Sequence, residues 1–129
     1  MNVFMSAVQA GNRSGTGRYT EELVQALAAR GDLTITVQSA TPGAGQRHVW
    51  ARKWSRVLGP GGRYDVMHYP ANFCPLAGTR NTVVTVHDLS FLRHPEWFNA
   101  NRARYYRLAF AITRRRAARF IADSHATKQ

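Results

Sequence analysis

The sequence has a single cysteine, Cys74, among its 129 residues, so no disulfide can form within the chain and no cysteine-cluster zinc site can be built. Acidic residues are also scarce, with 7 Asp and Glu against 18 Lys and Arg. Three of them are glutamates, Glu21, Glu22 and Glu96. A hydrolase that works through paired carboxylates is therefore poorly supported.

Long hydrophobic segments and a signal peptide are missing as well. No run approaches the ~18 uninterrupted apolar residues that a membrane-spanning helix needs. The first residues carry no basic segment, and Ser6 and Gln9 interrupt their apolar run, so a secretory signal is not expected. Together with the single cysteine, these absences predict a soluble or peripheral protein of the reducing cytoplasm.

Most of the basic residues are arginines, and the formal net charge of the chain is +11. Such an excess attracts phosphates, nucleic acid or anionic lipid. The same excess is also expected from solvated surface arginines, from a bias of codon composition, or from the absence of an acidic partner domain. The net charge alone does not choose among these origins.

Short apolar strands alternate with helical segments along the chain. The expected strands cover residues 3–8, 33–37, 65–69, 82–86 and 118–122. The expected helices cover residues 18–30, 50–58 and 99–116. The strands are apolar throughout rather than alternating, which is typical of a parallel sheet covered on both faces. The sequence therefore predicts an α/β fold, a doubly wound parallel sheet.

Polar residues stand where several of these strands end. His68 lies near the end of the strand at residues 65–69, His87 and Asp88 follow the strand at residues 82–86, and the glycine-rich segment 11–17 follows the first strand. Open parallel sheets bind ligands beyond the carboxyl ends of their strands, so we expect a ligand cleft at this edge. The alternative for His87 is a ring that only satisfies backbone groups.

The glycine-rich segment lacks the full pattern of the common nucleotide-binding loops. A dinucleotide fingerprint needs a third glycine where Thr20 stands, and a P-loop needs a lysine, but the first lysine is Lys53. The segment is either a backbone that can approach a phosphate or sugar, or a plain turn. The histidines show no metal-binding spacing, and no serine has a nucleophile-elbow motif, so we expect neither a cofactor nor a metal.

Four segments, taken in order, resemble a known family. They read SGTGRYTEELVQALA, DVMHYPANFCPL, VVTVHDLSFLRHPEWF and ARFIADSHATKQ. Their order and spacing resemble the amino-terminal, acceptor-side domain of the family 4 glycosyltransferases of the GT-B class, and VHDLSFLRHPEWF is the most specific block. The match covers nearly the whole chain, so residues 1–129 are expected to form one Rossmann-like domain. The chain stops one turn into the helix that Ser124 would cap, so we expect a longer or a split protein.

The resemblance implies transfer of a sugar from a nucleotide-sugar donor to a glycan or lipid-linked acceptor. It implies retention of the anomeric configuration, generally without a metal. By resemblance, His87 is the catalytic residue beside the transferred sugar. The substrate-binding residues that it implies are Gly15, Thr16, Gly17, Asp88 and Ser124. Asp88 would shape the acceptor pocket, and the glycine loop would approach the donor phosphates and the acceptor.

The family's nucleotide-binding half, with two glutamates spaced by seven residues, has no counterpart in this chain. We therefore expect the isolated chain to be inactive and to need a carboxyl-terminal GT-B domain or a partner chain. The alternative is a basic Rossmann-like binding module for nucleic acid or anionic membrane, suggested by the arginines between residues 102 and 119. Nucleic acid is the weaker of these partners, since no recognition-helix or RNA-binding signature accompanies the arginines. Contact with the inner face of the plasma membrane is expected if the acceptor is lipid-linked.

Overall fold

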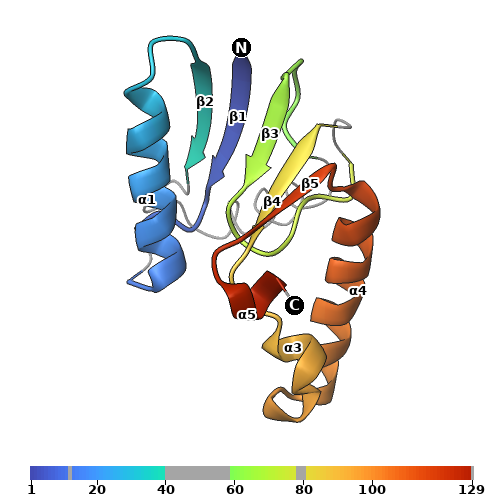
Figure 1. Cartoon of the computed structure of the whole chain (residues 1–129). Coiled ribbons are helices and arrows are strands. Elements are labelled where there is room, and N and C mark those ends of the chain that lie inside the picture. The colour runs from blue at the N-terminus through green and yellow to red at the C-terminus, as the bar shows by residue number, and fades with distance from the viewer. Residues whose placement is uncertain (12, 40–58, 78–80, 129) are drawn as a thin grey trace, which may run out of the picture.

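A computed structural model describes residues 1–11, 13–39, 59–77 and 81–128 of the chain. In this part of the chain, five strands form one sheet in the order β2-β1-β3-β4-β5 (Figure 1). The strands are β1 (Asn2–Ala7), β2 (Thr34–Ser39), β3 (Val66–Tyr69), β4 (Thr82–Val86) and β5 (Arg119–Ala122). The helix predicted at residues 50–58 lies outside the described residues.

All neighbouring strands in this sheet are parallel, which confirms the predicted α/β fold. Their carboxyl ends therefore meet at one edge, near α3 and α5 (Figure 1). β1 pairs with β2 on one side and with β3 on the other, so the chain order reverses between β1 and β3. Ligands of such sheets bind outside the carboxyl ends at this reversal.

Helix α1 (Gly15–Ala28) begins three residues before the predicted position, because Ser14 caps it. The Ser14 hydroxyl accepts the Gly17 N–H at 3.3 Å, which satisfies one of the first free donors of the helix. The glycines at 15 and 17 were expected to be part of a loop, and this expectation is wrong. They form the first turn of a helix that contacts β1 and β2.

The second long helix, α4 (Ala100–Arg116), begins at Asn99, whose side chain accepts the Arg102 N–H at 2.8 Å. It follows the short helix α3 (Ser90–Arg93) and the 3₁₀ turn η1 (Pro95–Trp97). Helices α3 and α4 cover one face of the sheet with a shared apolar cluster. Its buried members are Phe4, Met67, Tyr69, Val84, Val86, Phe91 and Phe110. Burying each phenylalanine of this cluster stabilises the fold by roughly 2–3 kcal/mol.

The two adjacent tyrosines of α4 lie in different surroundings. Tyr105 is 55% exposed. Tyr106 takes the inner position because its ring stacks on Phe73 at a centroid distance of 5.6 Å. Phe110, one turn further along α4, is buried. The edge strand β5 is exposed along its whole length.

Candidate functional site

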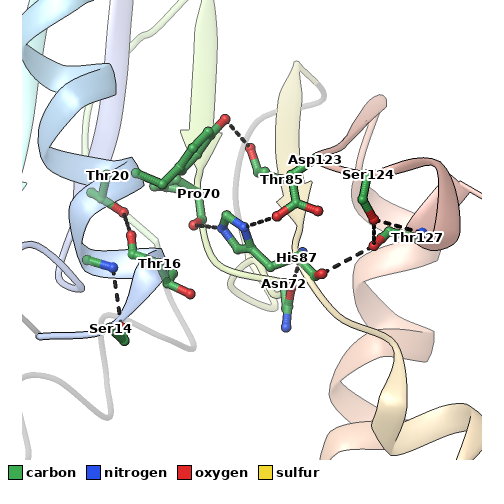
Figure 2. Close-up of polar contacts among 12 residues, drawn as sticks. Ser14, Thr16, Thr20, Pro70, Asn72, Thr85, His87, Asp123, Ser124 and Thr127 are labelled. Carbon is green, nitrogen blue, oxygen red and sulfur yellow. Dashed lines mark hydrogen bonds and ion pairs between the residues drawn. The ribbon is translucent and has the colours of Figure 1, made fainter.

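The His87 side chain is held between two oxygen atoms at the carboxyl edge of the sheet (Figure 2). Its Nδ1 lies 2.7 Å from Asp123 Oδ2, and its Nε2 lies 2.9 Å from the Pro70 carbonyl oxygen. A carboxylate and a carbonyl both accept hydrogen bonds, so a ring that donates to both carries a proton on each nitrogen and a positive charge. Both ring nitrogens of His87 therefore face an acceptor oxygen, and the ring forms an ion pair with Asp123 when both nitrogens carry a proton.

The backbone of His87 is fixed as firmly as its ring. Its N–H donates to Asn72 Oδ1 at 2.8 Å, and its carbonyl accepts the Thr127 hydroxyl at 3.2 Å. Asn72 has a φ of 51°, a left-handed conformation that asparagine tolerates better than most residues. The Asn72 N–H donates to the Thr85 carbonyl at 2.8 Å, which ties this turn to β4. Separate segments of the chain thus converge on His87.

Helix α1 contacts the His87 ring through the side chain of Tyr19. The Tyr19 ring meets the His87 ring edge-on at a centroid distance of 5.0 Å, and its hydroxyl lies 3.2 Å from Thr85 Oγ1. The same Thr85 oxygen is 2.9 Å from His68 Nε2. This chain of contacts fixes Tyr19 against the end of β4.

His68 does not lie at the ligand edge, contrary to the expectation from its position near a strand end. It belongs to β3 and is 7% exposed, with its ring bonded to Thr85 in the interior. This burial lowers the pKa of His68, because the charged ring would lose its hydration. His68 is consequently a buried structural residue beneath the site.

The three residues expected to approach donor phosphates, Gly15, Thr16 and Gly17, form the first turn of α1. Gly17 is buried, whereas Gly15 is exposed. The first N–H groups of a helix have no partner within the helix, and they carry its positive end. One turn into the helix, Tyr19 contacts His87, so α1 begins beside the site (Figure 2).

Asp88 bonds to Ser90, the first residue of α3, and also lines a cavity. Its carboxylate accepts the Ser90 N–H at 2.7 Å, and its other oxygen accepts the Ser90 hydroxyl. The cavity has a volume of about 230 Å³ and lies between α3, α4 and the turn at Asn72. It is lined by Asn72, Phe73, Asp88, Ser90, Phe91, Phe98, Arg102 and Tyr106.

Ser124 is the cap that its sequence position predicted. Its hydroxyl accepts the Thr127 N–H at 3.2 Å and opens α5 (His125–Lys128). Thr127 in turn donates to the His87 carbonyl, so Ser124 supports the site from the β5 side. Its neighbour Asp123, the partner of the His87 ring, was missed. The signal for it was present, since Asp123 follows β5 as His87 follows β4.

Neither a metal cluster nor a membrane-spanning helix is found in the described part of the chain. Within those ranges, no group of three or more His, Cys, Asp or Glu side chains could hold a metal ion. No helix in the same ranges is long and apolar enough to span a lipid bilayer. Comparison of the chain with protein-family models, curated proteins and solved structures finds no match.

Proposed function

We propose that the chain is the amino-terminal, acceptor-side part of a retaining GT-B glycosyltransferase, which transfers a sugar from a nucleotide sugar to an acceptor. The observation that carries the proposal is the His87 ring, held by Asp123 and the Pro70 carbonyl at the edge where parallel sheets bind ligands. This arrangement goes beyond a ring that satisfies the backbone, because the second contact is to a carboxylate. It agrees with the VHDLSF segment that resembles the family.

The geometry suits a reaction that needs placed charges more than a strong base. In a retaining transfer, negative charge grows on the leaving phosphate and positive charge grows on the sugar. When the His87 ring carries a proton on both nitrogens, it is a preoriented positive charge that favours the first of these without reorganising during the reaction, and Asp123 supplies a compensating negative charge. The positive end of α1 adds to the attraction of donor phosphates.

The experiment follows from what the proposal requires beyond this chain. The reading frame after Gln129, or a partner gene, should encode a second Rossmann-like half with two glutamates spaced by seven residues. The complete protein should transfer sugar from one of a panel of nucleotide sugars, and NMR of the product should show the anomeric configuration of the donor. The 129-residue chain alone should transfer none. A complete protein without such a half, or a product of inverted configuration, would exclude the proposal.

A second function, binding to an anionic membrane, is favoured by the surface of α3, η1 and α4. Large apolar side chains are exposed there, with Trp97 at 68%, Leu108 at 64% and Leu92 at 39%. Exposed arginines stand among them on the same segments, including Arg93 and Arg104. Contact with a nucleic-acid backbone does not stabilise exposed apolar side chains, whereas burial in the apolar interior of a lipid bilayer does. This surface therefore favours lipid over nucleic acid.

A further inference from the structure

Strand β5 is an outer strand of the sheet, and in the described part of the chain it pairs with β4 alone (Figure 1). The Ala118 N–H donates to the Thr82 carbonyl, so the backbone groups of Phe120, two residues further along, also face β4. The backbone groups of Arg119 and Ile121 then point away from the sheet. An outer strand of this kind offers free donors and acceptors to a further strand.

The side chains of β5 are apolar on both faces of the sheet. Phe120 is 44% exposed and Ile121 is 41% exposed. Successive side chains of a strand point to opposite faces, so a layer on one face cannot cover both of them. On β2, the outer strand at the other side of the sheet, Val37 is the one large apolar side chain that is exposed. Covering β5 would therefore bury more apolar surface than covering β2.

A cavity of about 520 Å³ lies between β5, α4 and α5, and its lining is mostly apolar. Phe110 and Phe120 belong to this lining, and their ring centroids lie 6.4 Å apart. Two basic side chains, Arg114 of α4 and Lys128 of α5, also line the cavity. Neither of them has a carboxylate partner among the residues that the structure describes. The surface beside β5 is thus apolar and positively charged.

Two kinds of partner fit this surface poorly. The hydrocarbon of a bilayer would cover the apolar side chains, but it would leave the outward backbone groups of Arg119 and Ile121 without hydrogen bonds, which is costly. A second copy of the chain would bring its own net charge of +11 to a basic surface, and like charges repel.

A strand from a different, acidic polypeptide fits every one of these features. It would pair with the outward backbone groups of β5 and cover apolar side chains on both faces. Carboxylates on it would pair with Arg114 and Lys128. We propose that β5 is the docking edge for an acidic partner protein, which adds a strand to the sheet. The inference does not depend on the proposed transfer of sugar.

The positions of the charges specify the partner strand further. Arg119 lies on the face opposite to Phe120, whereas Arg114 and Lys128 line the cavity to which Phe120 belongs. Positive charge is therefore available on both faces of β5. The partner strand should carry apolar residues at its centre and acidic residues at both of its ends.

The probe is a blocked peptide of this design, acetyl-Glu-Glu-Ile-Val-Ile-Glu-Glu-amide, titrated into the ¹⁵N-labelled chain at low salt. The NMR shifts should be largest at the outward amides of Arg119 and Ile121. The same peptide N-methylated at the valine and at one isoleucine keeps its charges but cannot pair along either edge. It should bind at least about tenfold more weakly. A peptide with lysine in place of each glutamate should not bind.

Three variants of the chain test the charges beside β5. Arg114→Gln and Lys128→Gln should each weaken binding of the acidic peptide by about two- to fivefold, as expected for partly exposed ion pairs. Arg104→Gln is the matched control, because Arg104 is exposed on α4 and does not line the cavity. It should leave the affinity unchanged.

Binding that depends on the free peptide amides and falls in Arg114→Gln and Lys128→Gln, but not in Arg104→Gln, supports the docking edge. No binding, or equal binding of the N-methylated peptide or of the lysine peptide, overturns it. Equal losses in all three variants overturn it as well, since net charge alone would then explain the binding. Tighter binding of dodecyl phosphate at the same residues would assign the edge to lipid. Dimerisation of the chain alone that Ile121→Lys abolishes would assign it to a second copy.

Discussion

His87 Nδ1 lies 2.7 Å from Asp123 Oδ2, and this contact joins the end of β4 to the end of β5. The side chains are only 14% and 33% exposed, so water screens their attraction less than it screens that of a surface pair. The same ring reaches the Pro70 carbonyl at the end of β3. One side chain thus ties three neighbouring strand ends together at the edge where a ligand would bind.

Replacing His87 with alanine in the complete enzyme should lower kcat by about 10²-fold or more, which is about 2.7 kcal/mol of transition-state stabilisation. The melting temperature should also fall, because Asp123 and the Pro70 carbonyl lose their partner. The rate must therefore be expressed per folded molecule. A destabilised variant with a normal kcat would show that His87 only holds the strand ends together.

The coupling between His87 and Asp123 can be measured by a double-mutant cycle with His87→Gln and Asp123→Asn. We expect an interaction of about 1–2 kcal/mol in the free energy of unfolding from urea titrations at pH 6, because the pair is partly buried. The exposed pair Arg18–Glu22, whose atoms lie 2.8 Å apart, is the control and should show far weaker coupling. Additive effects at His87 and Asp123 would mean that the contact contributes nothing to folding.

The strands could be predicted because each is a short apolar run bounded by turn residues. The strand at residues 82–86 has the predicted bounds, and the others differ by one or two residues. The start of α1 was misplaced because the glycines suggested a loop, and the capping hydroxyl of Ser14 outweighed them. Local sequence signals therefore located the elements better than their ends.

The partners of His87 could not be predicted in the same way. Its position at a strand end follows from the sequence, but Asp123 is 36 residues away along the chain and Asn72 is 15 residues away. Only the order of strands brings these ends together. The left-handed conformation of Asn72 has no sequence signal beyond the tolerance of asparagine for it. His68 carried the same signal as His87, yet its side chain is buried.

His68 should make folding stability depend on pH. Burial lowers its pKa from the ordinary value of 6.5, so the unfolded chain takes up a proton that the folded chain resists. Stability should therefore decrease as the pH falls below about 6.5, and level off below the folded-state pKa, with a slope of at most about 1.4 kcal/mol per pH unit.

Urea unfolding of the wild type and of His68→Gln at pH 7.5 and pH 5.5 checks this dependence. The glutamine amide can still reach Thr85 but does not titrate, so the variant should lose less stability between the two pH values. His125→Gln, at an exposed position, should behave like the wild type. Equal pH dependence in wild type and His68→Gln would show that His68 does not cause the loss.

The surface of η1 and α4 should bind anionic vesicles more strongly than neutral ones. Each basic group near such a membrane adds about 1 kcal/mol, so Arg104→Gln should weaken binding to phosphatidylserine vesicles about fivefold. Trp97→Ala should weaken it further by removing an exposed aromatic anchor.

Arg30→Gln is the control variant. It removes the same charge beyond the end of α1, where Arg30 pairs with Asp32, and should change vesicle binding little. Vesicle flotation at low salt measures all four proteins. Equal flotation with neutral and anionic vesicles would exclude an electrostatic membrane contact, and equal losses from Arg104→Gln and Arg30→Gln would show that only net charge matters.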